Sequence, residues 1–497
     1  MVVCSDIIIE KFAKNNLILT THAFNAIIKN GIDIDLIIER AISERQWLIT
    51  QEFIEEFVIK EEKVKGEIEK QKVEVIRPSK KIFSEEISSE LKISNKKEIS
   101  GNSTCSGKIE DFLEYFNQKY NNLASVIRER PNMAGTIQIK NLKKYPNENL
   151  SLIVMVREKR ESKKGYKFLD VEDPTGELTI LIPKENERLQ EAYEGILLDT
   201  VIGVTGVFRN NLFIANDFVE PELPMVHQPK NAEEPVHLAF LSDIHVGSYL
   251  FLKKEFSKFI DWLNLKDNNN KEIAEKVKYI FIAGDLVDGI GIYPTQEYEL
   301  SIPDIYKQYD YFAELLMEIP SYIEIVISVG NHDAVRSSEP QPKISKDIAP
   351  KLYDLENVHL VGNPAQVETH NVKTLIYHGT SLDNIISSLS YCSYSHPETA
   401  MIEYLKKRYL VPSYGNDLIS PEKKDVLFID DIPDILHCGH VHTNGYATYR
   451  GVRVINSGTF QGRTKYQEQL GHVPTPAVVP VINLQNFELH AIHFKNE

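Results

Sequence analysis

The chain has 497 residues, of which 42% are hydrophobic and 26% charged, a composition typical of a globular protein with room for roughly two to four domains. Its net charge of −16 argues against strong non-specific binding of DNA or acidic membranes by the chain alone. That charge still leaves room for a nucleic-acid enzyme with a local basic groove or a basic partner.

The sequence shows no convincing targeting or membrane segment. Its N-terminus lacks a basic leader followed by a long apolar run, and no stretch approaches the ~18 consecutive apolar residues of a membrane span. The four cysteines are far apart and form no CxxC pair, which disfavours a disulfide scaffold or a zinc module and indicates a reducing compartment. We therefore expect a cytoplasmic protein without a membrane partner.

Residues 1–70 are expected to form a helical domain that docks a partner. Their apolar residues recur mostly at helical spacing, and Asn30, Gly31 and Asp33 mark a helix stop and the next start. Residues 71–107 are polar, rich in Ser, Lys and Asn and poor in aromatic residues. This composition predicts a flexible linker.

Residues 108–225 are expected to form an OB-fold domain preceded by a helix over about 108–130. Five or six runs rich in β-branched residues follow, the first at 135–142, and turns such as Asn210-Asn211 separate them. This pattern suits a small closed barrel, of which the OB-fold is the natural candidate, and such barrels often bind single strands. A scaffold barrel without nucleic-acid contacts fits the pattern equally well.

Residues 226–497 alternate apolar strands with amphipathic helices, which predicts an α/β domain with functional groups at the strand ends. Five apolar runs end abruptly in polar motifs: Asp243 and His245; Asp285 and Asp288; Asn331, His332 and Asp333; His378; and His440 and His442. Each motif alone fits an ordinary turn. Five in succession favour a divalent-metal site, because carboxylates and imidazoles are ligands for Mn²⁺, Fe or Zn²⁺. The number of ligands fits two ions better than one.

The motifs D-x-H, G-D-x-x-D, G-N-H-D, a lone H and G-H-x-H stand in this order, and over about 236–460 the chain resembles the calcineurin-like metallophosphoesterase superfamily. The resemblance implies two divalent metal ions, with Mn²⁺ as first candidate and Fe or Zn²⁺ as alternatives. It assigns one ion to Asp243, His245, Asp285 and His442. It assigns the other to Asp285, Asn331, His378 and His440, so that Asp285 bridges the two ions.

Further segments indicate which branch of this superfamily the chain resembles. The runs at 288–294, 334–336, 339–342, 456–461 and 472–477, together with the helical start, the linker and the barrel, are similar to the small subunits of archaeal family D DNA polymerases. That family implies a proofreading 3′→5′ exonuclease that acts on single-stranded or mismatched 3′ ends of DNA. It also implies a heterodimer with a large catalytic polymerase subunit.

Two other functions remain open. The same metal centre would serve a phosphatase or a small-molecule phosphodiesterase, and a non-catalytic polymerase scaffold subunit could carry a vestigial site. The barrel favours the nuclease over a simple phosphatase, which does not need one. The complete set of ligand positions disfavours the scaffold.

Roles beyond the metal ligands follow from the same resemblance. His332, next to the ligand Asn331, is the expected general acid, and its alternative role is to orient a ligand. Asp288 and Asp333 are expected to fix loops. Phosphate or the terminal nucleotide is expected to contact Arg336, Gln461 and Arg463, for which a surface-charge role is equally open. The apolar segment 473–482 is the candidate docking surface for the large subunit, with an edge strand over 478–482 as the alternative.

Overall fold

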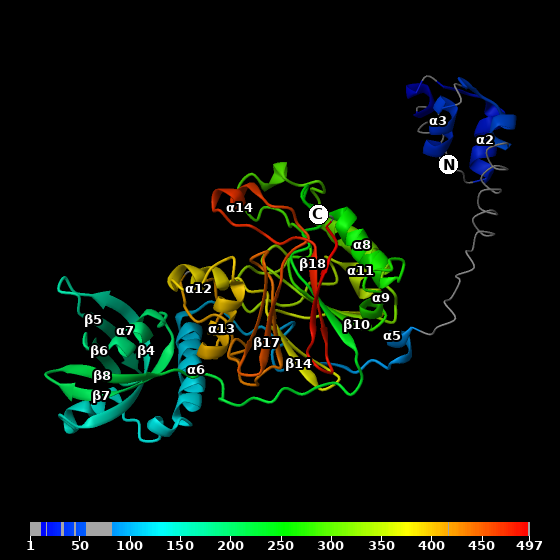
Figure 1. The fold of residues 1–497 in the computed structure, drawn as a ribbon. Helices are drawn as coiled ribbons and strands as arrows, with labels where there is room; N and C mark the ends of the chain where they lie inside the picture. The colour runs from blue at the N-terminus through cyan, green and yellow to red at the C-terminus, as the bar shows by residue number, and fades with distance from the viewer. Residues whose placement is uncertain are drawn as a thin grey trace. The chain divides into compact units, whose positions relative to one another are not determined.

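A computed structural model describes residues 11–15, 17–30, 34–43, 46–55, 82–415 and 417–495. The chain divides into two compact units, Met1–Lys81 and Ile82–Glu497. Both contain secondary structure that the figure labels by element (Figure 1). Among the described residues, no helix is both long and apolar enough to span a membrane.

The described part of the first unit contains the helices α2 (Thr21–Asn30) and α3 (Ile34–Ser43), together with helical residues at 11–14 and 51–55. It also contains a short parallel strand pair, in which β1 (Ile18–Leu19) pairs with β2 (Leu48–Ile49). Apolar side chains from these elements form a small core of their own, which includes Phe12, Ala23, Ile27, Ile37 and Ile49. The remainder of the expected 1–70 domain, and residues 71–81 of the expected linker, lie outside the described residues.

The prediction of a flexible linker is wrong for residues 82–107. These residues form α5 (Phe83–Glu86) and β3 (Leu91–Ile93), and β3 pairs with a strand of the second unit's α/β domain. The buried Lys97 Nζ donates to two backbone carbonyls at 3.0 and 2.7 Å. The polar side chains that suggested disorder thus find fixed hydrogen-bond partners on the folded domain.

A five-stranded closed barrel follows the helix α6 (Ile109–Arg128). Its strands lie in the order β4-β5-β6-β8-β7, and α7 (Glu187–Glu194) connects β6 to β7. The strands are β4 (Asn149–Glu161), β5 (Lys167–Asp173), β6 (Gly176–Ile182), β7 (Val201–Arg209) and β8 (Leu212–Val219). The strand expected over 135–142 does not form, because its second half belongs to the 3₁₀ helix η2 (Ile139–Lys144). A shorter 3₁₀ helix, η1, spans Pro131–Met133.

Two six-stranded sheets form the α/β domain. The first has the order β12-β11-β10-β9-β18-β19, with bounds Val358–Leu360, Glu324–Ser328, Val277–Ala283, His237–Leu241, Val478–Asn483 and Leu489–His493. The second has the order β16-β17-β15-β14-β13-β3, with bounds Asn444–Tyr449, Val452–Ser457, Ile435–Cys438, Val372–Ile376, Ala365–Thr369 and Leu91–Ile93.

The sheets lie face to face between two layers of helices (Figure 1). In β9, Leu238 and Phe240 pack between the sheets, whereas Ala239 and Leu241 pack beneath helices. Such two-sided burial explains why these strands are apolar throughout. The helices on the side of the first sheet are α8 (Lys253–Leu263), α9 (Lys271–Ala274), α10 (Ile305–Met317) and α11 (Pro350–Tyr353). Those on the side of the second sheet are α12 (Leu382–Ser388) and α13 (Pro397–Lys407). Two short helices, η3 (Gln296–Tyr298) and α14 (Lys465–Gln469), lie in connecting segments.

The prediction that the segment 473–482 docks the large subunit is wrong for its second half. Residues 478–483 form β18, which lies between β9 and β19 and is therefore not an edge strand. Val479 and Val481 are 1% and 0% exposed, so they cannot contact a partner. Val473, 67% exposed, remains available.

Candidate metal centre

The carboxyl ends of five strands bring the predicted ligands together. Strands β9, β10 and β11 are parallel neighbours in one sheet, and β14 and β15 are parallel neighbours in the other. Parallel strands deliver the residues that follow them to one edge of a sheet. All seven predicted ligands lie in loops at this edge: Asp243, His245, Asp285, Asn331, His378, His440 and His442.

The backbone is bent sharply at five of these ligands. Asp243, His245, Asp285, His440 and His442 all have left-handed φ angles, between 50° and 70°. Residues other than glycine rarely adopt this conformation, which costs about 1–3 kcal/mol where it is imposed and is concentrated at functional sites. The loops therefore hold ligand side chains in place against a local conformational cost.

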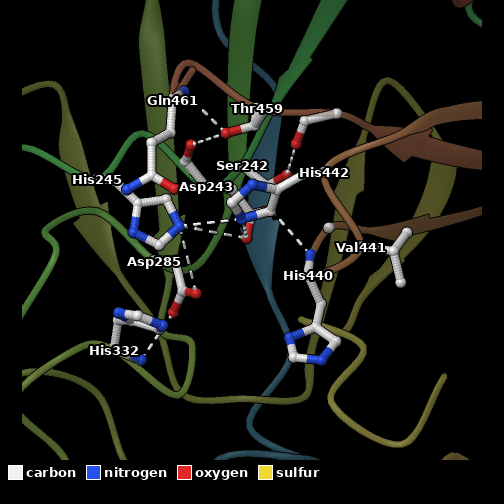
Figure 2. Close-up of polar contacts among 12 residues, drawn as sticks. Ser242, Asp243, His245, Asp285, His332, His440, Val441, His442, Thr459 and Gln461 are labelled. Atoms are coloured by element: carbon white, nitrogen blue, oxygen red, sulfur yellow. Dashed lines mark hydrogen bonds and ion pairs between the residues drawn. The ribbon is translucent and has the colours of Figure 1, made fainter. Parts of the chain in front are cut away.

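The first cluster consists of Asp243, His245 and His442 (Figure 2). His442 Nε2 lies 3.3 Å from Asp243 Oδ1 and 3.1 Å from His245 Nε2. His245 Nδ1 donates to Asp288 Oδ1 at 3.1 Å, which leaves its Nε2 as the atom free to bind a cation. Asp243 is 0% exposed, and its Oδ1 has no hydrogen-bond partner.

The second cluster joins Asp285, Asn331, His378 and His440. His378 Nδ1 donates to the carbonyl of Ala283 at 2.7 Å, so Nε2 is the ring atom left to bind either a proton or a cation. That Nε2 faces Asn331 Oδ1 at 2.9 Å and Asp285 Oδ2 at 3.4 Å. His440 Nδ1 faces the same Asn331 oxygen at 3.2 Å.

These contacts fit divalent cations. The orphaned carboxylate oxygen of Asp243 and the buried carboxylate of Asp285 would be costly to bury without positive charge among them. Carboxylate, amide and imidazole donors are the set that suits Mn²⁺, Fe and Zn²⁺. Asp285 also lies 3.8 Å from His245, so its Oδ2 faces both clusters.

The electrostatics of the centre depend on Asp285. Burial opposes its charge, but the neighbouring His378 and His332 hold the pKa of Asp285 well below its usual range. Burial also opposes protonation of His378, but the carboxylates of Asp285 and Asp243 raise the pKa of His378 to about 10. Protons and metal cations therefore compete for the same donors.

His332 lies at the edge of the second cluster. Its backbone N–H donates to Asp285 Oδ1 at 2.8 Å, and its ring Nδ1 donates to the carbonyl of Asp288 at 2.7 Å. Asp333 accepts hydrogen bonds from the Gly330 N–H and the Tyr309 hydroxyl, at 2.8 and 2.9 Å. Asp288 and Asp333 thus hold neighbouring groups in place, as expected of loop-fixing residues.

The three predicted substrate contacts are not brought together. Arg336 forms an ion pair with Glu422 at 2.8 Å and donates to Ser103 at 3.0 Å, and it does not line the cavity at the metal centre. Gln461 lines that cavity, but its amide donates to Asp288 at 2.9 Å and to Ser248 at 3.0 Å. Arg463 is exposed and outside the cavity lining. Phosphate binding by Arg336 is therefore not supported, since its guanidinium is engaged elsewhere.

A cavity of about 590 Å³ opens at the metal centre and contains residues that the sequence did not single out. Asp383 Oδ2 lies 3.0 Å from His440 Nε2 and orients that ring. Gln467, also in the lining, contacts His442 at 2.9 Å, and Gln296, which is buried and outside the lining, contacts Asp288 at 3.0 Å. These residues lie outside the motifs, and no sequence signal identifies them.

The predicted ligands all lie within the range of a family match, residues 236–444. The matching family model is described as calcineurin-like phosphoesterase. A relative described as DNA polymerase II small subunit, from Methanocaldococcus jannaschii, is 42% identical over 410 residues, covering 81% of this chain and 68% of its own. One with the same description from Methanothermobacter thermautotrophicus is 37% identical over 484 residues, covering 96% and 97%. A solved structure described as a novel archaeal phosphodiesterase covers 52% of this chain and 99% of its own at 15% identity, with a TM-score of 0.28.

Proposed function

Since the chain belongs to the family of archaeal DNA polymerase II small subunits, we propose that it is a metal-dependent 3′→5′ exonuclease. Its substrate would be the 3′-terminal phosphodiester of single-stranded or mismatched DNA. In this role it would proofread for a large catalytic polymerase subunit, with which it would form a heterodimer.

The observation that carries this proposal is the position of Asp285 between two buried donor clusters. Its Oδ2 lies 3.4 Å from His378 and 3.8 Å from His245, and the side chain is 2% exposed. A carboxylate at this place can bridge two cations. Burying so many charged donors is costly unless cations compensate them. A subunit that served only as a scaffold would have no physical reason to carry this cost.

Two divalent metal ions would bind here, one on Asp243, His245, Asp285 and His442 and one on Asp285, Asn331, His378 and His440. We propose Mn²⁺, with Fe or Zn²⁺ as alternatives. Bound ions of this kind polarise a phosphoryl oxygen and lower the pKa of water so that hydroxide forms at neutral pH.

His332 would supply the proton to the leaving 3′ oxygen. Its Nδ1 is engaged by the carbonyl of Asp288, so Nε2 is the ring atom left to exchange a proton with substrate. The residue lines the cavity, where a phosphodiester would lie. The ring lies against His245, with 4.7 Å between centroids, which fixes its orientation. These features suit a general acid.

The barrel would position the single strand that leads to the metal centre, whereas the large subunit would supply most of the binding affinity. We propose that it is an OB-fold, an assignment supported by five strands in the order β4-β5-β6-β8-β7 with β6 and β8 parallel. OB-folds commonly bind single strands through aromatic and basic faces. This barrel also favours a nuclease over a phosphatase or small-molecule phosphodiesterase.

A comparison of substrates tests the proposal. Single-stranded DNA labelled at its 5′ end, incubated with the full chain and Mn²⁺, should shorten one nucleotide at a time from the 3′ end. p-Nitrophenyl phosphate should be hydrolysed far more slowly, and Asp285→Asn should abolish cleavage. Rapid hydrolysis of p-nitrophenyl phosphate without DNA cleavage would identify a phosphatase instead. Absence of both activities in metal-loaded protein would indicate a scaffold.

A further inference from the structure

Aromatic and apolar side chains form part of the lining of the cavity at the metal centre. Tyr293 comes from the loop after β10. Tyr394, Tyr466, Leu470 and His472 come from the α12–α13 connection and from the region of α14. We refer to these five residues as the aromatic walls.

Three of the five residues of the aromatic walls are exposed, and Tyr394 and His472 are half-buried. Tyr466 is 69% exposed, Leu470 51% and Tyr293 37%. Large apolar groups gathered around a functional cavity indicate a surface that is covered when a ligand binds. None of the metal ligands needs these side chains, because their hydrogen-bond partners are Asp288, Ala283, Asp383 and Gln467.

The charge of the cavity indicates which part of a nucleic acid contacts the walls. Among the described residues that line it there is no Lys or Arg, whereas Asp383 and Glu299 are both present. A phosphate backbone finds no basic side chain there. Nucleobases, by contrast, present neutral π faces that stack on Tyr and His rings whatever the sequence.

Hydrogen bonds hold two of the rings in fixed orientations. The Tyr293 hydroxyl donates to Glu299 Oε2 at 3.0 Å, and the Tyr394 hydroxyl donates to Asp383 Oδ1 at 2.9 Å. Tyr394 also packs on His472, with 3.8 Å between ring centroids. Rings held in this way lose little entropy when a base stacks on them.

Two of the aromatic residues adjoin residues of the proposed centre. Asp383, which accepts from Tyr394, also pairs with the proposed metal ligand His440 at 3.0 Å. The Tyr293 ring lies 6.5 Å from the ring of His332, the proposed general acid. A base stacked on Tyr293 or Tyr394 would therefore lie close to the proposed reaction centre.

We propose that the aromatic walls are a stacking subsite for the unpaired bases at the 3′ end of the substrate, an inference that rests on the proposed nuclease function. The subsite selects ends whose bases are free to leave the helix. Paired ends must first unstack, at a cost of a few kcal/mol. Stacking at this place thus discriminates frayed or mismatched ends from paired ends without reading sequence.

Two single-stranded oligonucleotides test the proposal with the full chain and Mn²⁺. One carries normal bases, and the other has abasic tetrahydrofuran residues at its last two 3′ positions. Tyr466→Ala should raise KM about 5- to 100-fold for the normal end and leave KM for the abasic end unchanged. Tyr466→Phe should restore the normal KM. Tyr298→Ala is the matched control, because Tyr298 is 78% exposed on the neighbouring η3 and does not line the cavity.

A fluorescence measurement separates failure of this inference from failure of the proposed nuclease. 2-Aminopurine at the 3′ terminus should be quenched on binding to the wild-type chain with Ca²⁺ in place of Mn²⁺, and much less by Tyr466→Ala. Equal KM values for normal and abasic ends, or unchanged quenching in the variant, would overturn the stacking subsite while leaving the nuclease intact. Quenching lost in the variant, in a protein that cleaves no DNA, would support the subsite and reject the nuclease.

Discussion

A methyl group added at Gly330 would lie 2.2 Å from Oδ1 of Asp285. The glycine of the G-N-H-D motif is therefore needed for the space beside the bridging carboxylate, since its φ lies outside the left-handed region. Gly439, before the first histidine of G-H-x-H, has the same relationship to Asp243, at 2.4 Å from Oδ2. Both glycines allow two loops to approach each other across the metal centre.

The first prediction follows from this contact. Gly330→Ala should displace Asp285 and weaken metal binding and DNA cleavage by about 10- to 100-fold, although residue 330 is no ligand. Metal titration by calorimetry and single-turnover cleavage measure the two effects. Gly135→Ala is the control, because a Cβ there meets nothing within 4 Å. Normal metal affinity in Gly330→Ala would contradict the steric argument.

The sequence predicted which residues gather at this edge of the sheets, because they stand in short motifs at strand ends, where topology alone brings them together. It could not identify Asp383, which lies 57 residues before its partner His440 and in no motif. It also assigned Arg336 to substrate by its closeness to G-N-H-D in sequence. The structure instead pairs Arg336 with Glu422, a contact that depends on tertiary packing.

A second prediction separates binding from proton transfer. Asp285→Ala should lose both metal ions and all cleavage, because one carboxylate faces both clusters. His332→Ala should retain both ions and lose about 10²- to 10⁴-fold in rate, the usual contribution of a general acid. Metal content by elemental analysis and single-turnover rates check both. Two ions retained in Asp285→Ala would reject the ligand scheme, and normal cleavage by His332→Ala would reject the acid.

A third prediction concerns Asp383. Its carboxylate accepts from His440 Nε2, which fixes the ring so that Nδ1 faces Asn331. Asp383→Asn should weaken metal binding about 10- to 100-fold, the usual effect of removing such a partner. The measurement is Mn²⁺ affinity, with Asp310→Asn on α10 as the control, because Asp310 pairs with Lys351 and does not line the cavity. An unchanged affinity would show that His440 needs no orienting partner.

Outside the metal centre, amino-acid composition predicted the structure less well than the sequence motifs did. Residues 82–107 are polar enough to suggest a linker, yet Ser103 and Thr104 donate to the buried Glu422 and β3 adds a strand to a sheet. Such partners lie more than 250 residues away in the chain, so local composition cannot predict them. The apolar segment at 478–482 suggested a docking surface, whereas pairing with β9 and β19 buries it.

A fourth prediction concerns stability against pH. Burial raises the pKa of Glu339 to about 7 from its ordinary value of 4.5. Between these values the folded chain keeps a proton that the unfolded chain releases, so the free energy of unfolding falls as pH rises through this window. The loss is at most ~1.4 kcal/mol per pH unit. Glu339→Gln removes the titration.

Urea unfolding of wild type and Glu339→Gln at pH values between about 5 and 8 checks this. As pH rises, the free energy of unfolding of the wild type should fall relative to that of Glu339→Gln. Parallel pH profiles for the two proteins would mean that Glu339 is charged when folded, with its Tyr377 hydrogen bond at 2.7 Å compensating the burial.

The last prediction concerns the net charge of −16. Binding of single strands depends on salt through counterions that Lys and Arg contacts release, with a slope of about −0.7 per contact. Because no Lys or Arg is found among the described residues that line the cavity, the isolated chain should bind single-stranded DNA weakly, with a slope no steeper than about −2. We propose that the large subunit supplies the basic track, so the complex should bind more tightly and with a steeper slope.

Fluorescence anisotropy across a salt series, with and without the large subunit, measures both the affinity and the salt slope. Tight binding and a steep slope in the isolated chain would contradict this division of roles, because the cations would then have to lie on this chain outside the cavity.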